Sequence, residues 1–297
     1  MRCAKMPHDN GKFYGFTEDR VFGWVMEDKE FCKFILQTIL PDLKIQKIEE
    51  LRLQEELNSA GLLTKDVRLD VLVTDEQGRV YNIEMQNANE HNLGKRMRYY
   101  LSAIDQHNTL RKGATYNELK EAYVIFLCDF DYTGQGRLLS SFHTYDDHDR
   151  AYILPTGAHF IIISDKGNRH GQSQDLQNLA KLMNGEKITG NKHFDYAQEK
   201  IAAINQDPQR RAQIMLYETR LLEREQYGEA KGRKAGMRAG EAEGRKAGRL
   251  EATLADIRKN IAGYRSFGIS DEKILERLIA DYGSEIDPKQ IKAMMEE

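Results

Sequence analysis

The sequence predicts an α/β protein in which helices flank a mixed sheet of about four or five strands, followed by a helical C-terminal extension. Three observations lead to this fold class. Segments 67–73 and 80–86 alternate apolar and polar residues on either side of a glycine-containing loop, which is typical of a β-hairpin. Segment 122–128 is almost wholly apolar, as expected of a central strand covered on both faces. Segments with apolar residues at helical spacing precede and follow these strands.

Composition narrows the class of protein. The chain has 297 residues, of which 40% are hydrophobic and 31% charged, so it can bury a sizeable core and is typical of a globular protein. It lacks a long apolar run, and its N-terminus lacks the apolar centre of a signal peptide. Three cysteines without ligand spacing suit a reducing compartment. We therefore expect a cytoplasmic protein with no membrane partner. The net charge of −3 does not itself indicate nucleic-acid binding.

The N-terminal third contains a helix and a first strand before the hairpin. Residues 1–15 are polar and predicted to be flexible, and a domain follows from 16 to 225. Apolar residues at helical spacing predict a helix from Phe22 to Leu40, closed by Pro41. A strand around Ile48–Leu53 and a loop at 58–61 lead into the hairpin.

The alternation within the hairpin places its acidic residues. In the first strand Val67, Leu69, Val71 and Val73 are expected on one face and Asp70 on the other. In the second strand Tyr81, Ile83 and Met85 oppose Asn82, Glu84 and Gln86. Asp70 and Glu84 share a face only if the positions paired across the hairpin sum to an even number. A five-residue loop, 75–79, pairs them directly; a three-residue loop leaves them diagonal, and a four-residue loop separates them.

In either even register the two carboxylates predict a metal site. Like charges this close repel unless a cation lies between them. Hard oxygen ligands suit Mg²⁺, with Mn²⁺ as a substitute. Gln86 follows Glu84 by two residues, so its amide points to the same side and is placed to orient a water molecule.

The chain after the hairpin supplies positive charge and completes the sheet. An amphipathic helix from Leu93 to about Asn108 carries Lys95, Arg96 and Arg98 on its polar face, where they are placed either to bind phosphates or to face solvent. After the strand at 122–128, Asp129 and Asp131 form either a second metal site or caps of the following turn. The later elements expected are strands at 152–154 and 159–163 and helices at 176–183 and 201–225.

These motifs resemble a known family. Asp70 followed by Glu84-Met85-Gln86 on the next strand is similar to the D…E-x-K core of PD-(D/E)XK nucleases, in a variant with Gln in place of Lys. More closely, the chain resembles the PD-(D/E)XK nuclease family transposases, or recombination-promoting nuclease family. In that family an R-x-x-x-Y pattern, matched here by Arg96 and Tyr100, lies on the next helix. The resemblance extends over about residues 16–250 and implies a restriction-endonuclease-like fold.

The resemblance also implies roles for individual residues. Asp70, Glu84 and the Met85 carbonyl would bind the metal, with Glu30 as an additional acidic candidate from the first helix or an ordinary solvated charge. Asp70, Glu84 and Gln86 would form the catalytic set. Contacts to DNA phosphates would come from the basic helix, through Lys95, Arg96, Arg98 and Tyr100. Two departures are that Leu69 replaces the proline naming the superfamily, and that Gln86 removes a positive charge that would stabilise the transition state.

The C-terminal region has a repeat. Six glycines recur every fourth residue, at Gly228, Gly232, Gly236, Gly240, Gly244 and Gly248. Each costs a helix interior about 1 kcal/mol relative to alanine, so residues 226–252 are predicted to form a flexible or weakly helical arm in preference to a stable self-association helix. Residues 253–297 are expected to form a small helical tail, and the region is the candidate for contacts between copies of the chain.

Three functions from different classes follow from these features. The first is a Mg²⁺-dependent endonuclease acting on DNA. The second is a DNA-binding protein that keeps the nuclease fold without catalysis, and it predicts salt-sensitive binding that persists without divalent metal. The third is a structural protein organised by the glycine arm, which would neither bind nor cut DNA.

Overall fold

The computed structural model describes residues 11–57, 67–107, 110 and 113–296. The chain divides into two compact units, residues 1–216 and 217–297, each of which is considered by itself. The predicted loop at 58–61 and most of the predicted flexible N-terminus lie outside the described residues. No described helix combines the length and the apolar character needed to cross a bilayer.

The first unit is built on a mixed sheet, and the α/β fold class is confirmed. The order of the strands in the described part of the chain is β1-β2-β3-β4-β6-β5. Neighbours β1/β2, β2/β3 and β6/β5 are antiparallel, whereas β3/β4 and β4/β6 are parallel. The strands are β1 Ile48–Leu57, β2 Val67–Asp75, β3 Val80–Gln86, β4 Ala122–Cys128, β5 Leu139–Phe142 and β6 Ala158–Ser164.

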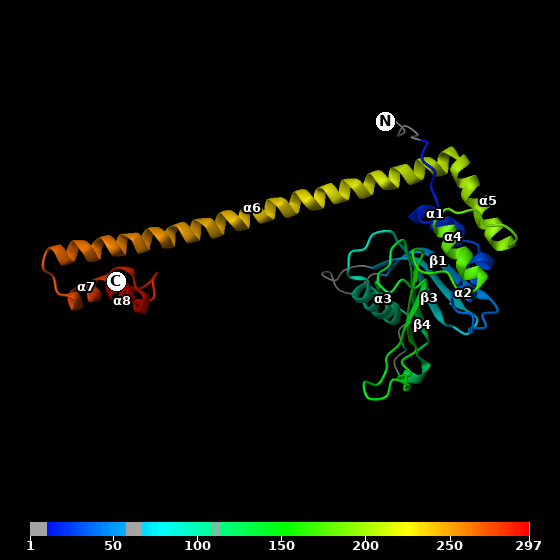
Figure 1. Ribbon diagram of the computed structural model, residues 1–297, viewed down its shortest axis with the longest axis horizontal. Coiled ribbons are helices and arrows are strands. Elements are labelled where there is room, and N and C mark those ends of the chain that lie inside the picture. Colours follow the sequence, from blue (N-terminus) through cyan, green and yellow to red (C-terminus); the bar gives the residue numbers. More distant parts are fainter. Residues whose placement is uncertain (1–10, 58–66, 108–109, 111–112, 297) are drawn as a thin grey trace. The chain divides into compact units, whose positions relative to one another are not determined.

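Helices cover both faces of this sheet (Figure 1). On one face α1 (Asp19–Met26), α2 (Lys29–Ile39), α4 (Gln174–Met183) and α5 (Lys192–Gln206) form the larger core cluster with the sheet. On the other face α3 (Leu93–His107) packs through Leu93, Met97 and Ile104. A short 3₁₀ helix, η1 (Tyr116–Glu118), precedes β4. The strand β4 is buried along its whole length, as its unbroken apolar run predicts.

Three expectations about individual elements are wrong. The helix predicted from Phe22 to Leu40 is two helices, because the Asp28 side chain accepts a hydrogen bond from the Phe31 N–H and so caps a new helix. The helix predicted at 201–225 is also interrupted, between α5 and α6 at Asp207, where Pro208 restricts the preceding backbone. Residues 152–154 form only an isolated bridge, Tyr145 to Ile153. The sixth strand is instead the short edge strand β5, which carries little periodic signal.

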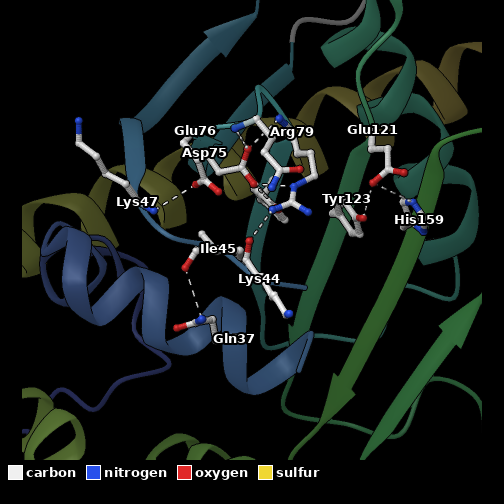
Figure 2. A network of polar contacts seen from close by, with 12 residues as sticks. Gln37, Lys44, Ile45, Lys47, Asp75, Glu76, Arg79, Glu121, Tyr123 and His159 are labelled. Atoms are coloured by element: carbon white, nitrogen blue, oxygen red, sulfur yellow. Dashed lines mark hydrogen bonds and ion pairs between the residues drawn. The ribbon is translucent and has the colours of Figure 1, made fainter. Parts of the chain in front are cut away.

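The hairpin turn between β2 and β3 is held by a buried ion pair (Figure 2). The Asp75 carboxylate accepts hydrogen bonds from the backbone N–H groups of Gln77 (2.9 Å) and Arg79 (3.0 Å). It also accepts from Arg79 Nε (2.6 Å) and from the Tyr81 hydroxyl (2.8 Å). Arg79 in turn donates to the Lys44 carbonyl at 3.2 Å. These contacts fix a loop of residues 75–79, with Thr74 opposite Val80.

Asp75→Ala is expected to lower the free energy of unfolding by about 3 kcal/mol, because it leaves the buried Arg79 guanidinium without its partner. Urea denaturation measures this loss. The double variant Asp75→Ala/Arg79→Leu removes both charges and should recover part of it. If the single and double variants are equally destabilised, the ion pair is not what holds the turn.

The second unit contains most of the helix α6 (Pro208–Ser266), followed by α7 (Asp271–Tyr282) and α8 (Pro288–Glu296). The glycine repeat lies inside α6, so the predicted arm is a helix, and its stability as an isolated helix stays a prediction. The residues between the glycines are mostly Ala, Lys, Arg and Glu, which are good helix formers. The tail forms a small core of its own, which consists of Ile257, Ile261, Ile274, Leu278, Ile286, Ile291, Met294 and Met295.

Candidate active site

The hairpin register brings Asp70 and Glu84 together. The ladder between β2 and β3 runs from Thr74–Val80 to Val71–Ile83, which is the even register of a five-residue loop. At the next pair of residues, Asp70 and Glu84, hydrogen bonds from the two acidic side chains take the place of the backbone hydrogen bonds. Glu84 Oε1 accepts the Asp70 backbone N–H at 2.9 Å, and Asp70 Oδ2 accepts the Met85 N–H at 3.1 Å. Both carboxylates therefore lie side by side where the two strands begin to separate.

The strand on the other side of Asp70 is irregular at the same level. Residues Leu53 and Glu55 of β1 pair with Val71 and Leu69, but Gln54 between them has φ = 53°. A non-glycine residue in the left-handed region is uncommon and often marks a functional constraint. The Gln54 amide donates to Asp70 Oδ1 at 3.4 Å, so the distorted residue points its side chain at the site.

This irregularity changes which faces of β2 are buried. Val67 and Leu69 pack in the cluster beneath α3 together with Leu72, whereas Val71 and Val73 pack in the larger cluster. The expectation that all four residues of the alternating set share one face is therefore wrong, because the alternation is interrupted between Leu69 and Leu72. Asp70 lies within the interruption. The alternation expected for β3 is confirmed, since Tyr81, Ile83 and Met85 all pack in the larger cluster.

Asp19 is a further acidic residue near Asp70 that the sequence analysis did not identify. It is the first residue of α1, and its Oδ1 accepts a hydrogen bond from the Gln54 amide at 3.2 Å. Its Oδ2 forms an ion pair with Arg68 Nη2 at 3.3 Å. Glu30, the candidate named from the sequence, lies on α2 with an exposed side chain that forms an ion pair with Lys33 at 3.0 Å. The first-helix acid next to Asp70 in the structure is thus Asp19.

Both carboxyl groups of the pair hold protons more tightly than usual. Burial, together with the charge of Asp19, raises the pKa of Asp70 to about 6. Glu84 is 1% exposed, and burial followed by the charge of Asp70 raises its pKa well above the usual value. Two acidic side chains that are this close together and this deeply buried favour either a shared proton or a bound cation. Such pairs are common at functional sites.

Arg96 is the positive charge at this site. It projects from α3, where its Nη2 lies 3.6 Å from Glu84 Oε2 and its Nη1 donates to the Gln86 side-chain oxygen. Its Nε donates to the Tyr100 hydroxyl at 2.9 Å, and its guanidinium carbon lies 5.3 Å from the centre of the Phe126 ring. The helical spacing of four residues places Arg96 and Tyr100 on one side of α3. One guanidinium thus contacts Glu84, Gln86 and Tyr100 together.

The remaining residues named from the sequence lie around this centre. The Gln86 side-chain N–H₂ donates to the Ala88 carbonyl at 2.8 Å, so both ends of its amide are engaged within the protein. Lys95 and Arg98 are exposed on α3. The structure therefore joins Asp70, Glu84, Gln86, Arg96 and Tyr100 through direct contacts, and leaves Lys95 and Arg98 facing solvent.

The donor atoms present fit a hard divalent cation with few protein ligands. Residues of a strand point their N–H and C=O to the same neighbouring strand, so the Met85 carbonyl points to the side on which its N–H meets Asp70. Two carboxylates and one carbonyl suit Mg²⁺, which usually keeps several waters. Among the described residues no group of three or more His, Cys, Asp or Glu side chains is placed to hold a metal.

The second acidic group, at the ends of β4 and β6, is accounted for within the protein. Asp131 caps the turn that follows β4, accepting from the N–H groups of Thr133, Gly134 and Gly136. Asp129 forms an ion pair with Lys166, which also lies 3.3 Å from Asp165. Of the two interpretations of Asp129 and Asp131, the turn cap describes Asp131, and Asp129 is neutralised by a lysine.

The metal-free protein is expected to lose stability as the pH rises from about 4 to about 6. Because the pKa of Asp70 is raised from 3.8 to about 6 on folding, the folded state keeps a proton there that the unfolded chain has released. The loss from this group is on the order of 2–3 kcal/mol and is complete above pH 6. Urea denaturation in EDTA across this range measures it.

Asp70→Asn is the control for this pH dependence, because burial also raises the pKa of Asp165 to about 6. The difference between wild type and Asp70→Asn isolates the contribution of Asp70. Parallel stability profiles for the two proteins would mean that Asp70 is not perturbed.

Comparison with known proteins now adds an independent observation. A family model described as "PD-(D/E)XK nuclease family transposase" matches residues 14–227, which include the whole sheet and all the site residues described above. Searches of the curated proteins and of the solved structures each return no match. The match begins before α1 and ends inside α6.

Proposed function

The chain belongs to the PD-(D/E)XK nuclease family transposases, and from this premise we propose that it is a Mg²⁺-dependent endonuclease that hydrolyses phosphodiester bonds in DNA. The observation that carries the proposal is the adjacent Asp70–Glu84 carboxylate pair, with raised pKa values and with the Arg96 guanidinium 3.6 Å from Glu84. Two buried carboxylates side by side destabilise the folded protein unless a bound cation offsets their charge, so such a pair is typical of a ligand site.

The proposed roles follow from the contacts. Asp70, Glu84 and the Met85 carbonyl would hold the metal ion, and a bound ion would supply a lowered pKa for a water molecule and neutralise charge on the phosphate. Arg96 stands beside Glu84 and is oriented by Tyr100, so its guanidinium is placed to bind a phosphate oxygen. The Gln86 amide contacts Ala88 and Arg96, and Gln86 orients the attacking water when that water replaces one of these two contacts. Lys95 and Arg98 on the same helix contact neighbouring phosphates.

Arg96 also supplies the charge that Gln86 lacks. The usual lysine of the motif would place an ammonium two residues after Glu84, and here that position is an uncharged amide. The Arg96 guanidinium bonds to this amide and lies 3.6 Å from Glu84. We propose that Arg96 thereby stabilises the negative charge that develops at phosphorus.

The test is cleavage of supercoiled plasmid during a titration with Mg²⁺ and, in parallel, Mn²⁺. Wild type should nick the plasmid only with divalent metal, and Asp70→Ala and Glu84→Ala should not. Equal nicking by all three proteins would identify a contaminant. Salt-sensitive DNA binding in EDTA without cleavage at any metal concentration would instead establish the alternative, a catalytically inactive DNA-binding member of the family.

A matched pair of variants tests which first-helix acid serves the site. Asp19→Asn removes the charge that raises the pKa of Asp70, whereas Glu30→Gln removes an exposed charge paired with Lys33. Under the proposal Asp19→Asn changes the Mg²⁺ concentration needed for half-maximal cleavage and Glu30→Gln does not. The reverse result would restore Glu30 as the additional acid.

A further inference from the structure

The helix α6 carries a row of positive charges along one side. Side chains from 219 to 252 are all exposed in the structure. At 100° per residue, a set of its cations falls within about 60° of one line along the helix. We call this set the basic face; it comprises Arg220, Arg224, Lys231, Lys234, Arg238, Arg245, Lys246 and Arg249. The last four of these line one shallow groove together with Glu241 and Ala242, which confirms that they share a side of the helix.

The acidic residues of this stretch lie elsewhere on the helix. Every Asp or Glu between 218 and 251 falls at least about 80° from the centre line of the basic face. Within this stretch Arg245 forms an ion pair with Glu241 at 3.4 Å, with both side chains well exposed. The segregation is notable because the whole chain has a net charge of −3. Local charge separation of this kind is typical of a surface for a charged partner.

The arrangement works against the isolated helix. Like charges three or four residues apart repel, as Lys231, Lys234 and Arg238 do, and each such pair destabilises a helix by a few tenths of a kcal/mol. The glycines do not explain this arrangement, because their positions step around the helix by about 40° each time. A Cβ added at any repeat glycine would meet nothing within 4 Å. A polyanion along the basic face would relieve the repulsion.

The chemistry of the face favours duplex DNA among polyanions. From Arg220 to Arg249 the basic face extends about 44 Å, somewhat more than one turn of B-form DNA. It contains a single aromatic residue, Tyr227, so it lacks the stacking platforms that bind single strands. It also lacks the continuous apolar stripe of a helix that binds membranes.

We propose that the basic face of α6 binds the phosphate backbone of duplex DNA independently of base sequence. The identity of the polyanion rests on the proposed nuclease function, whereas the existence of the surface does not. Bound in this way, the face would add affinity for DNA that depends on salt and not on divalent metal.

The test measures binding of the 297-residue chain to a 30-base-pair duplex of arbitrary sequence, by fluorescence anisotropy in EDTA at several salt concentrations. One variant neutralises the face, as Lys231→Gln/Lys234→Gln/Arg238→Gln/Arg245→Gln. At about 100 mM salt it should bind at least tenfold more weakly, and the slope of log K against log salt should fall by about 3.

A second variant moves charge without changing composition. This variant combines two exchanges, which are Lys231→Glu with Glu229→Lys and Arg245→Glu with Glu243→Arg. It keeps the net charge but transfers two cations to the opposite side of α6. This exchange should weaken binding at least as much as neutralisation. Circular dichroism reports whether each variant keeps its helix. If the exchanged protein binds like wild type, net charge alone is responsible and the inference fails.

Other outcomes separate this inference from the nuclease proposal. If the neutralised variant binds DNA like wild type but changes its sedimentation, the basic face is a contact between copies and the inference is overturned. If wild type binds through the face but never cleaves, the inference stands and the nuclease proposal fails. If wild type cleaves and both variants bind unchanged, the nuclease proposal stands and the inference fails.

Discussion

Glu84→Gln is expected to reduce Mg²⁺-dependent DNA cleavage by about 10³-fold or more while making the metal-free protein more stable. The amide keeps an oxygen to accept the Asp70 N–H, so the strand ends stay in register. It removes a charge that is almost fully buried beside Asp70 and whose pKa is raised well above normal. Asp70 stays close enough to balance the charge of Arg96, so removing one of two adjacent buried carboxylates relieves their repulsion and should stabilise the protein by about 1 kcal/mol.

The measurement combines single-turnover cleavage with urea denaturation in EDTA at pH 7.5. Glu90→Gln, an exposed acid after β3, is the matched control and should change neither quantity. A Glu84→Gln protein that is inactive because it has lost stability would contradict the prediction. In that case Glu84 would be a structural carboxylate and not a metal ligand.

Arg96→Ala is expected to lower the single-turnover cleavage rate by about 10²- to 10³-fold, because it removes the positive charge next to the reacting phosphate. Adding Gln86→Lys to this variant should recover at least about tenfold, since an ammonium at residue 86 lies on the same face as Glu84. The rescue distinguishes a charge that acts in catalysis from a side chain that only packs against Tyr100 and Phe126.

Arg150→Ala serves as the control for Arg96→Ala, because it removes the same charge from an exposed surface position. It should cleave at the wild-type rate when DNA is saturating. Failure of Gln86→Lys to improve the Arg96→Ala protein, in a variant that remains folded, would show that Arg96 does not replace the missing lysine.

The parts of the site that sequence reasoning predicted are those fixed by local geometry. Asp70 and Glu84 are 14 residues apart, and strand periodicity with a short turn reduces their arrangement to a few registers. Arg96 was identified because the following helix comes directly after the hairpin and carries its cations on one side. The helix α3, which lies between β3 and β4, and the buried strand β4 follow from the same kind of local pattern.

The missed residues come from distant parts of the chain. Asp19 lies 51 positions before Asp70, and no periodic pattern connects them. Gln54 is an ordinary polar residue in a strand until its φ of 53° is known. Both are set by packing of α1 and β1 against the hairpin, which a single sequence does not encode in its spacing. A search for polar residues next to breaks in strand alternation would have found Gln54, but not Asp19.

The predicted helix boundaries are wrong for a related reason. Asp28 and Pro208 are local signals of a cap and a helix start, yet apolar periodicity continues on both sides of each and favours a single longer helix. The glycine repeat of α6 is helical, because the alanine and charged residues between the glycines are good helix formers. The summed cost of the glycines concerns the stability of this helix, which remains a prediction.

The Asp75–Arg79 turn restricts how this protein can vary. Exposed hairpin tips usually accept extra residues, and they are favoured places for tags or inserted domains. Here one additional residue between Thr74 and Val80 would turn Glu84 to the far side of the sheet from Asp70. A related chain that keeps both acids should therefore differ in this loop by pairs of residues. An engineered one-residue insertion at residue 77 should abolish the proposed cleavage and also lower the free energy of unfolding, because the apolar side chains of β3 would turn away from the core together with Glu84.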